Sequence, residues 1–159
     1  MERHIGSAGM LQPANFSVLM VDDTTAIREA IARSLARRGC RVTTATNGVE
    51  ALEILRKQSF DVIITDLNMP DRGGLWLWRQ ALVVRPELRG RFVLVASEPL
   101  PEPRSLALFL ETERFVLKPI ALEMLWHHVE DVFTRAATTE TGARAEPRVS
   151  GAQRAESAP

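Results

Sequence analysis

Three aspartates and one lysine stand just beyond short apolar runs of this sequence, at the points where turn-forming residues begin. They are Asp22 and Asp23 after residues 18–21, Asp66 after the run that opens at Val62, and Lys118 after residues 115–117. Apolar runs of this kind are typical of buried strands in a parallel sheet. Because ligands of open α/β sheets bind beyond the carboxyl ends of the strands, we expect the three carboxylates and the ammonium group to share one site.

Such a site has the chemistry of phosphoryl transfer. Crowded carboxylates repel one another unless a cation lies among them, and a few oxygen ligands suit Mg²⁺, which also accepts phosphate oxygens. A carboxylate beside this metal can attack a phosphoryl group and form an acyl phosphate, with Lys118 neutralising the phosphoryl oxygens. A purely structural role as helix caps and turn formers would account for one aspartate, but it accounts poorly for the whole set.

The site must be positioned by alternating strands and helices. Five apolar runs predict strands, at residues 18–21, 42–45, 62–66, 92–96 and 115–117. Helical patterns fill the intervals and the region after the last strand, namely residues 24–38, 47–57, 75–84, 103–110 and 122–133. Alternation at these lengths requires crossover connections. The sequence therefore predicts an α/β fold, a doubly wound five-stranded parallel sheet with helices on both faces.

Composition narrows the class of protein further. The chain has 159 residues, with 45% apolar and 25% charged residues, as in ordinary globular proteins. Basic and acidic residues number 20 each, so the charge balance predicts no direct nucleic-acid partner and no membrane partner. No apolar run is long enough to span a bilayer, and the single cysteine, Cys40, excludes an internal disulfide. We therefore expect a cytoplasmic location.

The domain organisation follows from where periodicity starts and stops. Residues 1–14 mix Gly, Ser, Pro and charge, and they predict a flexible arm. Residues 15–135 hold all predicted elements and form the expected single domain. Residues 136–159 contain one large apolar residue, Val149, and predict a disordered tail that is too poor in apolar residues to form a DNA-binding module.

Three motifs together resemble the receiver domain of two-component response regulators. They are Asp22-Asp23, Asp66-Leu67-Asn68-Met69-Pro70 with Gly74, and Lys118-Pro119, and the resemblance spans residues 15–135. Chemotaxis receivers have a flavodoxin-like, doubly wound sheet with strand order 2-1-3-4-5, and the resemblance implies the same order here.

The resemblance also implies roles for individual residues. Asp66 would accept a phosphoryl group from a sensor histidine kinase or a histidine phosphotransfer protein. Mg²⁺ would be held by Asp22, Asp23, Asp66 and the backbone carbonyl of Asn68. Lys118 would pair with the phosphate through a cis Lys118–Pro119 peptide, and Phe115 would be the aromatic residue that reorients on activation.

The implied function is signalling rather than enzymatic turnover. The phosphorylated chain would act by binding a downstream protein, through the face built from the fourth helix, the fifth strand and the last helix. Family members place Thr or Ser at the end of the fourth strand, and the usual spacing from Asp66 leads here to Ala96, with Ser97 next. Alternate strand residues face opposite sides, so two alternatives remain open. Either Ser97 supplies the hydroxyl, or the hydroxyl is missing and switching is weakened.

Two other functions share parts of this pattern. The first is a receiver-like scaffold that binds proteins but switches weakly or not at all, because Ala96 supplies no hydroxyl. A haloacid-dehalogenase-type phosphohydrolase also uses Asp and Mg²⁺ on a parallel sheet, but that resemblance requires an acid–base Asp two residues beyond the nucleophile on the first strand. Thr24 and Thr25 occupy the corresponding positions, which argues against the hydrolase.

Overall fold

Five parallel strands form one sheet, as the sequence predicted, and they follow the order β2-β1-β3-β4-β5 that the resemblance implied. The computed structural model describes residues 16–69, 72–97 and 103–144. The strands are β1 (Ser17–Val21), β2 (Arg41–Ala45), β3 (Val62–Asp66), β4 (Phe92–Ala96) and β5 (Arg114–Leu117). The doubly wound, flavodoxin-like fold is confirmed.

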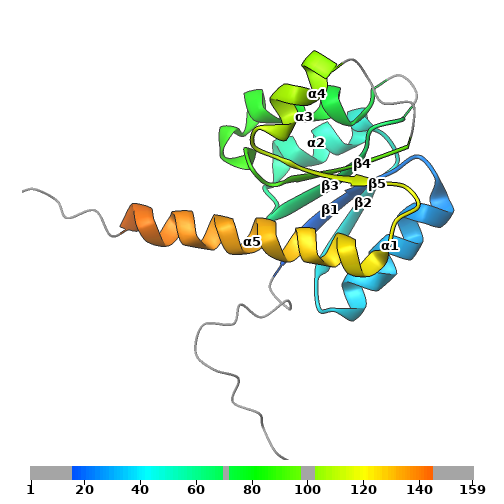
Figure 1. The fold of residues 1–159 in the computed structure, drawn as a ribbon, viewed down its shortest axis with the longest axis horizontal. Helices are drawn as coiled ribbons and strands as arrows, with labels where there is room; N and C mark the ends of the chain where they lie inside the picture. Colours follow the sequence, from blue (N-terminus) through cyan, green and yellow to red (C-terminus); the bar gives the residue numbers. More distant parts are fainter. Residues whose placement is uncertain (1–15, 70–71, 98–102, 145–159) are drawn as a thin grey trace, which may run out of the picture.

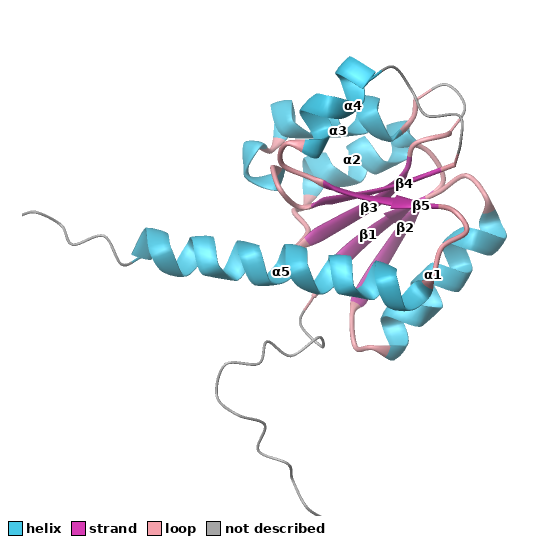
Figure 2. Ribbon diagram, in the orientation of Figure 1, coloured by secondary structure: helices cyan, strands magenta, loops and turns pink. Residues whose placement is uncertain are grey.

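Helices cover both faces of this sheet (Figures 1 and 2). One face carries α2 (Gly48–Lys57), α3 (Gly74–Val84) and α4 (Pro103–Leu110), and the other carries α1 (Thr25–Arg37) and α5 (Leu122–Arg144). A short 3₁₀ helix, η2 (Pro86–Leu88), lies between α3 and β4 and was not predicted. Pro86 opens this turn, where its missing N–H removes no helical bond.

The core consists of two apolar layers, one on each face of the sheet. In β4, Leu94 packs with the cluster beneath α2, α3 and α4, whereas Val93 and Val95 pack with the cluster beneath α1 and α5. All five residues of β4 are buried, because helices lie on both sides. Alternation therefore places the side chain of Ala96 on the same face as Leu94.

A capping pair of side chains stabilises the start of α2. The Asn47 side chain accepts a hydrogen bond of 2.8 Å from the backbone N–H of Glu50. The Glu50 carboxylate in turn accepts bonds from the backbone N–H and the hydroxyl of Thr46, at 2.9 and 2.6 Å. These bonds satisfy N–H groups that would otherwise have no partner at a helix start.

The prediction that order ends at Arg135 is wrong, because α5 continues to Arg144. A helix that is already nucleated and packed adds further residues at little cost, and this extension includes the good helix former Ala. The absence of apolar residues was therefore a poor guide to where the helix ends. The predicted arm at residues 1–14 and the remaining tail at residues 145–159 lie outside the described residues.

Candidate functional site

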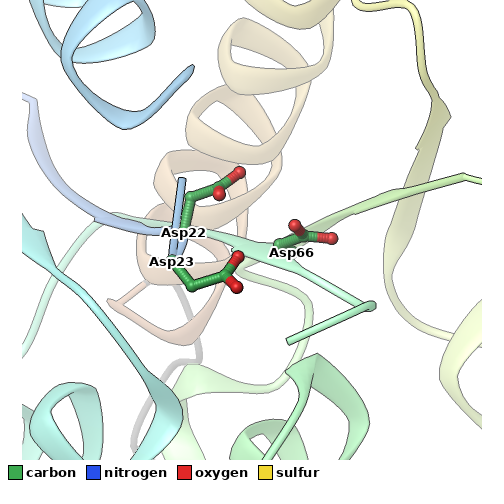
Figure 3. A group of neighbouring side chains, drawn as sticks. All are labelled: Asp22, Asp23 and Asp66. Atoms are coloured by element: carbon green, nitrogen blue, oxygen red, sulfur yellow. The ribbon is translucent and has the colours of Figure 1, made fainter. Parts of the chain in front are cut away.

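Asp22, Asp23 and Asp66 form one acidic cluster, in which carboxylate oxygens lie within 4.8 Å of one another (Figure 3). The cluster exists because β1 and β3 are neighbours in register, with Val21 opposite Thr65, and the next residue on each strand is an aspartate. The Asp22 and Asp66 side chains are buried, whereas Asp23 is exposed. The sequence-based expectation that these carboxylates meet at one edge of the sheet is therefore met by the geometry.

Lys118 reaches this cluster from the end of β5. Its Nζ lies 2.9 Å from Asp66 Oδ2 and 3.9 Å from Asp22 Oδ2. Its backbone N–H donates a 2.7 Å bond to the carbonyl of Ala96, which anchors Lys118 beside the end of β4. The Lys118–Pro119 peptide is cis, as the resemblance implied.

Both oxygens of the Asp66 carboxylate have a donor. Oδ2 accepts from the Lys118 ammonium, and Oδ1 accepts a 2.9 Å bond from the backbone N–H of Asn68. Asp66 is thus held from two sides by hydrogen-bond donors. These contacts orient the carboxylate, as a nucleophile requires.

Asp22 is less well satisfied. Its Oδ1 accepts a 2.8 Å bond from the backbone N–H of Thr24, but its buried Oδ2 has no hydrogen-bond donor among the described residues. Burial raises the pKa of the Asp22 carboxyl; Asp66 and Asp23 raise it as well, whereas the Thr24 N–H and Lys118 lower it. A buried carboxylate oxygen without a donor, beside two further carboxylates, is what a hard divalent cation would satisfy.

Two adjacent glycines hold the loop after β3 close to the site. A Cβ on Gly74 would lie 2.6 Å from Leu94 Cδ1 and 2.8 Å from the carbonyl oxygen of Asp66. A Cβ on Gly73 would overlap the carbonyl oxygen of Leu67. The resemblance includes Gly74 but not Gly73, whose tight contact depends on how the loop folds back.

The end of β4 shows how Ala96, Ser97 and Phe115 are arranged. Asp66 stands opposite Val95, so Ala96 occupies the next row of the sheet, and its side chain is fully buried. Ser97 follows the strand and is partly exposed, and its carbonyl accepts a 3.4 Å bond from the Asn68 side chain. Phe115 stands opposite Leu94 and packs against the same apolar layer. The register thus keeps Ala96, rather than Ser97, in the row beyond Asp66.

The sequence pattern gave no sign of Glu113, a buried carboxylate just before β5, at the end of the sheet away from the acidic cluster. The residue is only 6% exposed. It accepts hydrogen bonds from Trp78 Nε1, from the N–H groups of Gly90 and Phe92, and from the Thr112 hydroxyl. A Glu beside an apolar run is usually exposed. All of its donors except Thr112 lie 21 to 35 positions away in the sequence, so no local pattern pointed to it.

None of the helices in the described part of the chain is both long and apolar enough to cross a bilayer. The cytoplasmic location expected from the sequence stays a prediction.

Comparisons with known proteins agree with this geometry. Residues 18–130 match the family model of the response regulator receiver domain. The response regulator MprA of Mycobacterium sp. strain KMS is 33% identical over 123 residues, which cover 77% of this chain and 53% of that protein. The chain therefore spans about half the length of the curated relatives it matches.

Solved structures give the same result. The chemotaxis protein CheY4 of Vibrio cholerae aligns with a TM-score of 0.65 and 28% identity, covering 74% of this chain and 98% of that one. The REC domain of AraT, a response regulator from Geobacillus stearothermophilus, aligns with a TM-score of 0.66 and 27% identity, covering 79% and 98%. These matches are to receiver domains and response regulators, and none of them favours the phosphohydrolase. The chain belongs to the family of response regulator receiver domains of two-component systems.

Proposed function

We propose that this chain is a phosphoacceptor, in which Asp66 takes a phosphoryl group from a phosphohistidine on a sensor histidine kinase or a histidine phosphotransfer protein. One observation carries the proposal. The buried Asp66 carboxylate lies 2.9 Å from the Lys118 ammonium and within 4.8 Å of the Asp22 and Asp23 carboxylates. This combination of an oriented nucleophile, a fixed cation and an acidic cluster suits in-line phosphoryl transfer.

The transfer replaces one bond to phosphorus by another. A carboxylate oxygen of Asp66 bonds to phosphorus while the phosphorus–nitrogen bond of the phosphohistidine breaks. The imidazole nitrogen keeps the bonding electron pair, and the donor ring takes up one proton, so neutral imidazole leaves. Lys118 stays beside the new acyl phosphate and offsets the charge on its oxygens.

The residues present fit Mg²⁺ as the cofactor. The carboxylates of Asp22, Asp23 and Asp66 and the backbone carbonyl of Asn68 would hold it. The support is the buried Asp22 Oδ2, which has no donor among the described residues, and an all-oxygen donor set. When bound, the metal would neutralise charge that develops on the phosphoryl oxygens.

The phosphorylated chain would signal by binding a downstream protein through the face formed by α4, β5 and α5. These elements carry several exposed large apolar side chains, namely Leu108 and Leu110 of α4, Leu117 of β5 and Met124 of α5. Exposed apolar side chains on these three elements support a protein-binding role.

Incubation with acetyl phosphate and Mg²⁺, followed by intact mass measurement, tests the proposal. The wild-type chain should gain the mass of one phosphoryl group, and Asp66→Asn should gain none. A chelator should abolish the gain in the wild-type chain. A gain that survives in Asp66→Asn would show that another residue is the acceptor, and repeated turnover of a phosphate ester would show an enzyme instead.

A further inference from the structure

The end of β4 carries no side-chain hydroxyl in the row beyond Asp66. Ala96 is the last residue of the strand, is fully buried and offers only a methyl group. Its carbonyl is already bonded to the Lys118 N–H at 2.7 Å. Ala96 therefore has no side-chain atom that can form a hydrogen bond with a phosphoryl group.

Ser97 contributes its backbone rather than its hydroxyl in this structure. Its carbonyl oxygen lies 3.4 Å from Asn68 Nδ2. Within the described residues its hydroxyl makes no hydrogen bond to Asp66, Asn68 or Lys118. A carbonyl can only accept, so the amide nitrogen of Asn68, and not its oxygen, must be the atom that faces Ser97.

Asn68 therefore forms two hydrogen bonds at once, one to the Asp66 carboxylate and one to the Ser97 carbonyl after β4. Its backbone N–H donates a hydrogen bond of 2.9 Å to Asp66 Oδ1, and its side-chain amide donates one to the carbonyl of Ser97 beyond β4. One residue thus joins the carboxylate of the site to the chain that leaves the sheet after β4. A backbone bond of 2.8 Å from the Leu67 N–H to the Val95 carbonyl also joins these segments and continues the strand pairing.

We propose that Asn68 is the positioning residue that couples the Asp66 carboxyl to the end of β4, in place of a hydroxyl on that strand. This inference rests on the proposed phosphorylation of Asp66. A phosphoryl group would bring anionic oxygens close to Asn68, and hydrogen bonds to ionised acceptors are roughly twice as strong as those between neutral groups. The Ser97 bond is long, at 3.4 Å, and hence weak. The Asn68 amide exchanges Ser97 for a phosphoryl oxygen, and Ser97 is released.

The test uses the full chain labelled with ¹³C and ¹⁵N, and it measures the carbonyl chemical shift of residue 97. Before phosphorylation, Asn68→Ala should move this shift, because it removes the donor. Ser97→Ala changes the residue 97 shift by itself but keeps the carbonyl acceptor, so Asn68→Ala should move the shift by the same amount in the Ser97→Ala background, which is the matched control. An unchanged carbonyl shift in Asn68→Ala would show that the bond does not form, and that result overturns the inference without any phosphorylation.

The second measurement adds acetyl phosphate and Mg²⁺ and determines the phosphorylated fraction by intact mass. Per phosphorylated molecule, the wild-type chain and Ser97→Ala should show the same change at residue 97, and Asn68→Ala should lose it. Loss of the change in Ser97→Ala, with retention in Asn68→Ala, would assign the coupling to the Ser97 hydroxyl instead. If the wild-type chain gains no mass, the proposed function itself fails, and this outcome is read separately from the shifts.

Discussion

The indole N–H of Trp78 donates a hydrogen bond of 3.0 Å to Oε1 of the buried Glu113, and this bond joins α3 to the start of β5. The same oxygen accepts a hydrogen bond of 2.7 Å from the Gly90 N–H, and Oε2 accepts one of 3.1 Å from the Phe92 N–H. The Glu113 carboxylate therefore links α3 and the start of β4 to the start of β5, at the end of the sheet away from the acidic cluster. Its role is structural, since it satisfies donors that are otherwise buried.

We expect Glu113→Gln to lower the free energy of unfolding by about 2–4 kcal/mol. The substitution removes the charge and places an NH₂ group where one oxygen now accepts, so at least one buried donor loses its partner. Urea denaturation measures the change. Glu111→Gln, an exposed glutamate at the end of α4, is the matched control, with an expected change within about 0.5 kcal/mol. Equal effects in both variants would contradict a special role for Glu113.

Removal of the Lys118 ammonium should destabilise the chain when no divalent cation is present. Lys118→Met leaves the buried carboxylates of Asp66 and Asp22 without their cation, and loss of one partner of a buried ion pair costs about 3 kcal/mol. The same variant should accept the phosphoryl group more slowly from acetyl phosphate. Lys57→Met, on the exposed side of α2, is the control. A stable Lys118→Met protein in chelator would show that the ion pair contributes little.

Neutralising Asp22 should stabilise the metal-free chain at neutral pH. Burial raises the pKa of Asp22 above 3.8, so the folded chain holds this proton at pH values where the unfolded chain has lost it. The Asp22 contribution to stability therefore falls as pH rises from about 3.8 through the raised pKa, and it stays low above that window. Asp22→Asn keeps the bond to the Thr24 N–H without the charge.

The measurement is urea denaturation of both proteins between pH 3 and pH 8 in chelator. The advantage of Asp22→Asn should be near zero below the window and largest above it. With saturating Mg²⁺ the order should reverse, because a ligand that binds only the folded state stabilises it and the variant lacks one carboxylate ligand. An advantage that does not vary with pH would contradict the assigned cause.

Gly73→Ala should impair both stability and phosphorylation. The added methyl group meets the Leu67 carbonyl, so the loop that carries Asn68 must shift. We expect a loss of about 1–3 kcal/mol and a slower mass gain with acetyl phosphate. Gly90→Ala is the control variant. Its φ of 84° makes alanine costly to stability, but Gly90 lies before β4, at the end of the sheet away from the site. If Gly73→Ala phosphorylated at the wild-type rate, the loop would not depend on this contact.

The sequence alone determined the order of elements, the layered fold and the position of the acidic site. Apolar runs such as the one before Asp66 mark strands that are buried on both faces. A charged residue that follows such a run must lie where the strand leaves the sheet, at its carboxyl end. Because parallel strands share that edge, Asp22, Asp23, Asp66 and Lys118 could be brought together from their places in the chain. These inferences need only local periodicity and the rules of strand connection.

Only the tertiary structure decided what depends on contacts between distant residues. Glu113 meets Trp78 across 35 positions of the chain, and Asn68 meets the Ser97 carbonyl across 29. Neither pair has a local signature, since the partner of a hydrogen bond is selected by packing. The end of α5 at Arg144 also depends on packing, because a helix anchored by its packed residues continues through residues that would not form one alone.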